Sequence, residues 1–373
     1  MENKIIKNRE SNFELLRIFA MLMIVAHHLS VHGVQQISFD SSYLSYANGS
    51  FFNQLFTCFL VPGGKIGVAL FFMITGFFMC KKENSSAKKV VIQTAFCSVL
   101  TGLLFVISII AAKFGIWGGY NFPEFPGINK ILYILKCFFQ PVSSNWWFVS
   151  AYVILILCCP LINKYILQFS RRTFIIFLFI SWAFLYSAGG VLGNEYYSLI
   201  RAFFFYLLGA FIKLHSEEKF NAPKIVFAVL ACMVLWAVMT FCFYTNSVVH
   251  NEINSISFFD AIKNRIFFIL EHCISLPVFA FLFFKIFMSL NIKENSFINK
   301  ISSLTFGVYL IHDSAFGRFF IWNHLLHISD RQFSSKYFPV FAVLDILLVF
   351  MVSSVLSSLM LHFTQKIEGK RKR

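Results

Sequence analysis

Long apolar runs follow one another along most of the chain, and short polar segments separate them. A helix needs about 20 mostly apolar residues to cross the hydrocarbon core of a bilayer. The pattern therefore predicts an all-α polytopic transmembrane helical bundle with about ten spans. A further apolar stretch, Phe51–Leu60, is predicted to be a re-entrant or interfacial piece before the second span. The ten spans are expected at 13–32, 62–80, 90–112, 146–163, 173–189, 198–214, 224–244, 265–288, 302–324 and 338–362.

The distribution of Lys and Arg along the chain gives these spans an orientation. Cytoplasmic loops of membrane proteins carry an excess of basic residues. With a cytoplasmic N-terminus, 21 of the 32 Lys and Arg residues fall in inside segments and 7 fall in outside loops. This bias predicts that both termini are cytoplasmic. The expected organisation is a cytoplasmic N-terminal segment (1–12), a membrane domain (13–365) and a basic cytoplasmic tail (366–373), with no appended soluble domain.

Composition supports a membrane protein over a soluble one. The 373 residues are 58% hydrophobic and only 13% charged, and 51 of them are phenylalanine. A soluble domain has about 25% charged residues. So many phenylalanines cannot fit into one globular core, but they can face lipid. We therefore expect the lipid bilayer itself to be a partner of most of the chain.

The formal net charge of +15 could suggest nucleic acid as a partner. Nucleic-acid binders gather their basic residues on one face. Here the basic residues are spread over short loops between apolar runs, so we expect no nucleic acid. The nine cysteines lie mostly within or beside apolar runs and have no spacing typical of a zinc or redox site.

The first apolar segment is unusual because it carries an acid, an arginine and histidines. Charged groups inside a bilayer are costly and usually functional. Arg17 and His28 are eleven residues apart, about three full helical turns, so they lie on one face and about 16 Å apart along the helix axis. Glu14 precedes Arg17 at the i,i+3 spacing that allows an ion pair. This polar line is the strongest candidate for a functional site.

Each residue on this line has a structural and a functional interpretation. His28 could be a packing histidine hydrogen-bonded across helices, or a general base or acyl acceptor, because imidazole exchanges protons near neutral pH. Arg17 could be an interfacial arginine paired with Glu14, or a docking point for a phosphate arriving from the cytoplasm. His32 lies four residues beyond His28, a spacing that can bind a metal. No third ligand is evident nearby in the sequence, so we expect no metal, and His27 is expected to be structural.

Other polar residues in or beside the spans are weaker candidates. Lys65 opens the second span and is either a boundary anchor or an anion contact. Glu271 and His272 form a second polar position, in the eighth span. Candidates for contacts with the acceptor substrate are Trp147, Tyr152, Tyr309 and His312, the last of which precedes Asp313.

Four stretches together resemble acyltransferase family 3, a family of integral membrane acyltransferases. Arg17 and His28 are similar to its Arg-x10-His motif, with Glu14 at the preceding acidic position. The stretches 67–77, 147–152 and 304–312 resemble its later signatures, in order and at suitable positions. One departure is Ala69, where many members carry an acidic residue. The sequence contains no Gly-rich phosphate loop, no paired-aspartate motif and no G-x-S-x-G elbow that would indicate another chemistry.

This resemblance implies a plasma-membrane O-acyltransferase with no permanently bound cofactor. Its donor would be cytoplasmic acetyl-CoA, and its acceptor a hydroxyl of a cell-surface saccharide or of a lipid-linked glycan precursor. Arg17 and Lys65 would contact the donor, Glu14 would orient Arg17, and His28 would be the base or acyl carrier. Because some relatives carry an extracytoplasmic domain that this chain lacks, the membrane domain would either finish the reaction or pass the acyl group to a partner protein on the outer face.

A competing hypothesis is a transporter or flippase for a lipid-linked saccharide, which could also use intramembrane Arg, Glu and His. The absence of a recognisable internal repeat counts against it. Binding of acetyl-CoA separates the two hypotheses, because a flippase has no use for this donor.

Overall fold

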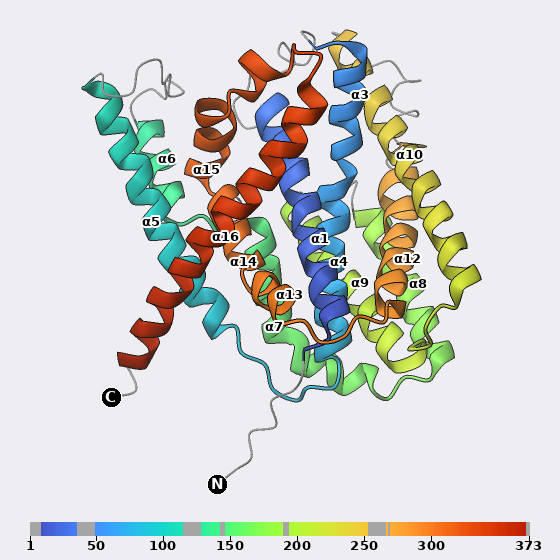
Figure 1. The fold of residues 1–373 in the computed structure, drawn as a ribbon. Helices are drawn as coiled ribbons and strands as arrows, with labels where there is room; N and C mark the ends of the chain where they lie inside the picture. Colours follow the sequence, from blue (N-terminus) through green and yellow to red (C-terminus); the bar gives the residue numbers. More distant parts are fainter. Residues whose placement is uncertain are drawn as a thin grey trace.

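The computed structural model describes residues 9–35, 49–114, 128–141, 146–188, 194–252, 266–267 and 269–370. These residues form helices joined by short connections, and no strand occurs among them (Figure 1). The prediction of an all-α polytopic bundle is therefore confirmed. The α-helices are α1 (Ser11–His28), α3 (Phe51–Leu60), α4 (Pro62–Met79), α5 (Lys88–Lys113), α6 (Ile128–Phe138), α7 (Trp147–Ile166), α8 (Arg171–Ala188), α9 (Asn194–His215), α10 (Ala222–Glu252), α12 (Leu276–Ser289), α13 (Ser296–Ser302), α14 (Thr305–His312), α15 (Ala315–Phe319) and α16 (Phe338–Lys370). Short π-helical segments are η1 (Leu29–Val34), η3 (Ile269–Ser275), η4 (Phe320–Leu325) and η5 (Ile328–Gln332).

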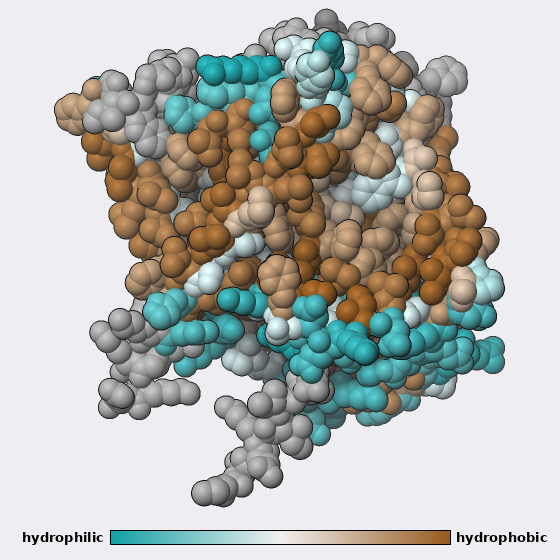
Figure 2. All heavy atoms as spheres, viewed as in Figure 1, coloured by the Kyte–Doolittle hydropathy of each residue, from teal (hydrophilic) through white to brown (hydrophobic). Residues whose placement is uncertain are grey.

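Eight helical segments among the described residues are long and apolar enough to cross a membrane. They correspond to eight of the ten predicted spans, and the other two predicted spans coincide with α8 and with the segment from α14 to η4. Figure 2 shows a belt of apolar side chains between two polar bands, as expected for a protein that crosses a bilayer. Helix α1 begins and α16 ends at the same side of the bundle (Figure 1), while the assignment of that side to the cytoplasm stays a prediction.

The stretch Phe51–Leu60 does not form a separate interfacial piece. It is helix α3, which leads directly into α4, and the two give an apolar helical segment over Phe51–Met79. Pro62 lies in the first turn of α4, where its missing N–H breaks no intrahelical hydrogen bond. The predicted second span therefore begins earlier than its sequence pattern suggested.

The predicted ninth span, 302–324, is not one continuous helix. Asp313 ends α14, and Ser314 has extended backbone angles (φ −66°, ψ 156°). The Ser314 hydroxyl accepts a hydrogen bond from the N–H of Gly317 at 2.9 Å, so Ser314 is the N-cap of α15. A serine that caps a new helix thus interrupts the span directly after its two polar residues, His312 and Asp313.

Helix α4 lies at the centre of the bundle, in contact with α1 and α9. Its crossing with α9 is very close, because a Cβ added to Gly76 would lie 2.0 Å from the Tyr206 carbonyl oxygen. A Cβ on Gly209 would lie 2.0 Å from the Met73 carbonyl oxygen. Small residues at such a contact let two backbones pack directly against each other in a membrane. This rigid centre supports α1, the helix that carries the polar line.

Candidate active site

The lower end of the polar line on α1 is an ion pair. Arg17 Nη1 donates to Glu14 Oε1 at 2.7 Å, and Glu14 is buried. The second Glu14 oxygen accepts a hydrogen bond from the Ser302 hydroxyl at the end of α13. Glu14 therefore fixes the Arg17 side chain relative to a second helix, while 29% of the Arg17 side chain remains exposed.

The upper end of the line is His28, whose ring meets a second histidine. His312 Nδ1 lies 2.6 Å from the Val308 carbonyl oxygen, which can only accept, so His312 Nδ1 carries the proton of that bond. In neutral His312 the other nitrogen, Nε2, is then an acceptor, and it lies 2.8 Å from His28 Nδ1. His28 Nδ1 must be the donor. The remaining nitrogen of neutral His28, Nε2, is therefore unprotonated and can accept a proton.

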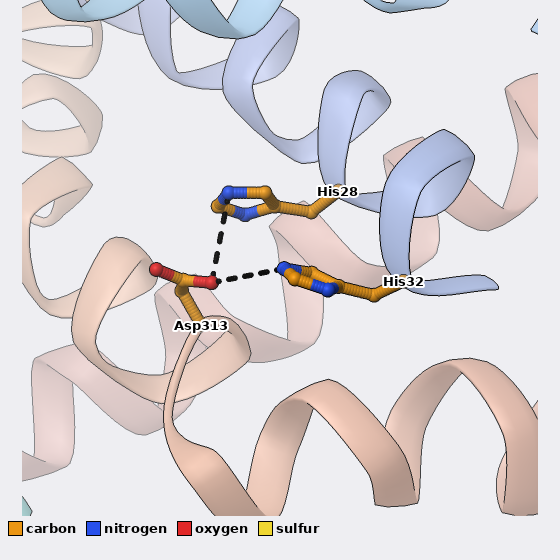
Figure 3. Close-up of side chains that lie close together, drawn as sticks. All are labelled: His28, His32 and Asp313. Atoms are coloured by element: carbon orange, nitrogen blue, oxygen red, sulfur yellow. Dashed lines mark ion pairs between the residues drawn. The ribbon is translucent and has the colours of Figure 1, made fainter. Parts of the chain in front are cut away.

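A buried carboxylate faces this free nitrogen. Asp313 Oδ1 lies 3.6 Å from His28 Nε2 and 3.4 Å from His32 Nε2 (Figure 3). The distance to His28 is longer than a hydrogen bond, so the His28 lone pair is not blocked. Once His28 takes up a proton, the same carboxylate stabilises the imidazolium ion by its negative charge.

The charge of Asp313 is balanced within the site. Arg318 makes a bidentate ion pair with the Asp313 carboxylate. Its Nε donates to Oδ1 at 2.8 Å, and its Nη2 donates to Oδ2 at 3.1 Å. Such bidentate pairs are strong and fix the plane of the carboxylate. The backbone at the break is held as well, because Trp146 Nε1 donates to the Asp313 carbonyl oxygen at 3.1 Å. The Ala315 N–H donates to the buried Gln140 side chain at 2.8 Å.

His28 opens into a cavity of about 590 Å³, the upper cavity. Its wall combines the polar groups just described with aromatic side chains. The lining residues are Ile24, His27, His28, Val31, His32, Gly64, Lys65, Val68, Trp147, Phe148, Ser198, Arg201, Tyr309, Asp313 and Arg318. His312 is fully buried and not among them. The sequence-based prediction that His312 lines the acceptor side differs from the structure, in which His312 lies behind His28 and determines the tautomer of the His28 ring.

Arg17 opens into a different cavity of about 320 Å³, the lower cavity. It lies toward the start of α1 and includes the side chains of Lys89 and Tyr152. Tyr152 was expected on the acceptor side, but it lies with Arg17. The other lining residues are Met21, Phe71, Thr75, Val90, Gln93, Phe148, Ser302, Ser303, Thr305, Phe306 and Tyr309.

Two aromatic side chains, Phe148 and Tyr309, line both cavities. Their ring centroids lie 5.4 Å apart with the rings at 74°, and both residues are buried. Phe148 comes from α7 and Tyr309 from α14, so the two helices meet here. The upper and lower cavities are thus neighbouring chambers with a shared wall of two rings, which we call the aromatic wall.

The remaining candidates lie around the upper cavity. Lys65 Nζ donates to Glu271 Oε1 at 2.7 Å, and Glu271 belongs to the π-helical segment η3. Lys65 lines the upper cavity together with His28 and is not among the residues that line the lower cavity with Arg17. His27 Nδ1 donates to the Val61 carbonyl oxygen at 2.8 Å, a structural bond as expected. The His272 side chain lies outside the described residues.

The model of the acyltransferase domain family matches residues 10–363 of the chain. The chain belongs to acyltransferase family 3. It is therefore a membrane acyltransferase, and the match includes both cavities and the aromatic wall between them. No curated protein and no solved structure gives a significant match to the chain.

Three residues of this acyltransferase site lie close enough together to be considered as metal ligands. Ligand atoms of His28, His32 and Asp313 lie within 4.8 Å of one another, close enough to hold an ion. However, the Asp313 oxygen that faces both histidines already accepts from Arg318. A divalent ion would lie next to this guanidinium and be repelled by it. The arrangement favours a base supported by a carboxylate over a metal centre.

The sequence pointed to some of these residues and missed others. Glu14, Arg17 and His28 are visible from helical spacing along one segment. The ion pair between Asp313 and Arg318 is not, because residues five positions apart point about 140° away from each other on a continuous helix. The signal that could have revealed it is Ser314 three residues before Gly317, a helix N-cap pattern within an apolar run.

Proposed function

We propose that this acyltransferase takes an acetyl group from acetyl-CoA at the cytoplasmic side and transfers it to a hydroxyl of a cell-surface saccharide or a lipid-linked glycan precursor. The observation that carries the proposal is the pair of neighbouring chambers. One chamber presents Arg17 and Lys89, which suit anionic phosphates, and the other presents the unprotonated Nε2 of His28. The family membership supports the acyl transfer itself.

In this mechanism the phosphates of CoA bind near Arg17, and Glu14 holds the guanidinium in place. The pantetheine arm would extend along α1 from Arg17 toward the aromatic wall. The thioester then lies between the two chambers, within reach of an acceptor hydroxyl in the upper cavity. Lys65, Trp147 and Arg318 line that cavity and are available to position the saccharide.

The bond changes need only His28 and the two substrates. His28 Nε2 removes the proton of the acceptor hydroxyl as the oxygen attacks the thioester carbonyl carbon. The tetrahedral intermediate collapses, the carbon–sulfur bond breaks, and the leaving CoA thiolate takes the proton back from His28. Asp313 stabilises the imidazolium that exists between these steps. No metal or nucleotide hydrolysis is required, because the thioester already carries the group-transfer potential.

The same geometry supports a two-step variant in which His28 Nε2 attacks the thioester and briefly carries the acetyl group. Rapid quenching of the protein with radiolabelled acetyl-CoA in the absence of acceptor separates the two. A label on His28 that an acceptor can remove indicates a carrier, and an unlabelled protein that still transfers to acceptor indicates a base. A partner protein on the outer face would be required only if the purified protein forms the carrier and cannot complete the transfer.

The function is tested by comparing plasma-membrane preparations and surface glycans from cells with and without the protein. We expect the glycans to lose one acetyl substituent when the protein is absent, measured by mass spectrometry. Purified protein in lipid nanodiscs should consume acetyl-CoA when acceptor is present. Unchanged glycans together with no consumption of acetyl-CoA would overturn the proposal, and movement of a lipid-linked saccharide without acetyl-CoA would identify a flippase.

Replacing Arg17 with glutamine is expected to weaken acetyl-CoA binding by about 10- to 100-fold, because charge-assisted hydrogen bonds contribute about 1.5–3 kcal/mol. The measurement is calorimetric titration of the purified protein with acetyl-CoA. Arg17→Lys keeps a positive charge beside Glu14 but cannot make the bidentate hydrogen bonds of a guanidinium to a phosphate. Its affinity for acetyl-CoA should therefore lie between those of the wild type and Arg17→Gln. Arg172→Gln, at an exposed position on α8, is the matched control and should bind like the wild type. Equal affinities in Arg17→Gln and wild type would exclude Arg17 as the donor's anchor.

A further inference from the structure

The hydroxyl of Tyr309 is a buried polar group that makes no hydrogen bond of normal length among the described residues, and it interacts electrostatically with Asp313 and Arg318. Only 3% of the residue is exposed. A buried hydroxyl without a partner costs about 1–3 kcal/mol relative to a satisfied one. A phenylalanine would fill the same space without this cost, so the hydroxyl requires an explanation.

The position of Tyr309 suggests that explanation. Its side chain is part of the aromatic wall and lines both the Arg17 chamber and the His28 chamber. It lies one turn before Asp313 on α14, and its ring is 6.3 Å from that of His312. A donor that enters from the Arg17 chamber must bring its thioester past this ring to reach His28.

Three of the hydrogen-bond donors that line the upper cavity already make hydrogen bonds. His27 donates to the Val61 carbonyl oxygen, Lys65 to Glu271, and Arg318 to Asp313. Tyr152 is confined to the lower cavity. A thioester carbonyl at the aromatic wall can therefore accept a hydrogen bond from the Tyr309 O–H, which makes no other hydrogen bond of normal length among the described residues.

We propose that Tyr309 is the oxyanion donor of this acyltransferase: its O–H hydrogen-bonds to the carbonyl oxygen of the acyl thioester. This inference rests on the proposed use of a thioester donor. When the acceptor oxygen attacks, the carbonyl π electrons move onto this oxygen, and the Tyr309 hydrogen bond stabilises the negative charge. The proton stays on Tyr309, and the electrons return when the carbon–sulfur bond breaks. The unpaired hydroxyl in the free protein is a preorganised partner for that charge.

Tyr309→Phe is the direct test, in purified protein with acetyl-CoA as the donor. Loss of one oxyanion-hole donor lowers kcat by about 10²–10³-fold in a well-studied protease, and we expect a loss of this order. The KM for acetyl-CoA should change much less, because the interaction strengthens in the transition state. The Tm should stay equal or rise, since the variant removes an unsatisfied hydroxyl and keeps the ring.

A matched control is Tyr206→Phe. Tyr206 is also buried, but its hydroxyl donates to Asn163 Oδ1 at 2.6 Å, and it lines neither of the two cavities. This control should lower the Tm and leave kcat close to the wild-type value. The reversed pattern, with Tyr309→Phe losing stability and keeping kcat, would assign the Tyr309 hydroxyl a structural role and overturn the inference.

A second measurement uses a donor analogue in which the carbonyl oxygen is replaced by sulfur, a weaker hydrogen-bond acceptor. The wild type should discriminate against the dithioester analogue, and Tyr309→Phe should discriminate less. Equal discrimination in both proteins would contradict the assignment. If the wild type consumes no thioester, the proposed function itself is refuted. If the wild type is active and Tyr309→Phe turns over at the normal rate, only the role of Tyr309 as oxyanion donor is refuted.

Discussion

Replacing His28 with glutamine is expected to lower acyl transfer by about 10²–10⁴-fold, the usual contribution of a general acid–base group. Glutamine keeps an amide near the position of the ring but cannot take up a proton at neutral pH. The loss should appear in kcat, measured with purified protein and acetyl-CoA. Binding of acetyl-CoA should persist, because the phosphate contacts are expected at Arg17, in the other chamber.

The matched control is His362→Gln, the same substitution on an exposed position of α16. It should leave both activity and membrane insertion unchanged. His28→Ala, which also removes the hydrogen bond to His312, should abolish surface acetylation in cells while the protein still inserts. An inserted His28 variant that acetylates at the normal rate would refute the mechanism.

Replacing Asp313 with asparagine should have the second large effect, on stability as well as on rate. The change leaves Arg318 as a half-buried cation without its carboxylate, and breaking a buried ion pair on one side costs about 3–5 kcal/mol. It also removes the negative charge beside His28, so the imidazolium is no longer stabilised. We expect a lower Tm and a loss in kcat of about 10²-fold or more.

A double variant separates these two effects. Asp313→Asn combined with Arg318→Met removes the unpaired cation, so most of the stability should return. Activity should not return, because the partner of the His28 imidazolium is still missing. Thermal unfolding and kcat are measured on the same preparations. Recovery of full activity in the double variant would show that Asp313 serves only to neutralise Arg318.

The polar line on α1 could be predicted because it depends on local helical geometry. Glu14, Arg17 and His28 share one helix, and a regular rotation per residue fixes their common face. The structure contains the expected pair between Glu14 and Arg17. The all-helical bundle could also be predicted, because a bilayer leaves few alternatives to apolar helices of a set length.

The partners of this line could not be read from the sequence. His28 and His312 are separated by 284 positions, and their contact depends on how α1 packs against α14. Likewise, the hydropathy of the ninth span could not reveal its interruption at Ser314. A capping hydroxyl changes the average hydropathy of the run very little, yet it ends one helix and starts another.

The aromatic wall also has a consequence for the electrochemical gradient across the membrane. A water-filled passage from one face of the bilayer to the other would let protons and small ions run down their electrochemical gradient. Phe148 and Tyr309 are packed against each other between the two chambers, so polar space near Arg17 and polar space near His28 are not one aqueous column. In the proposed reaction a slender pantetheine arm and a two-carbon group occupy this junction. In the proposed reaction the acyl group would thus pass from one chamber to the other without a continuous path for ions.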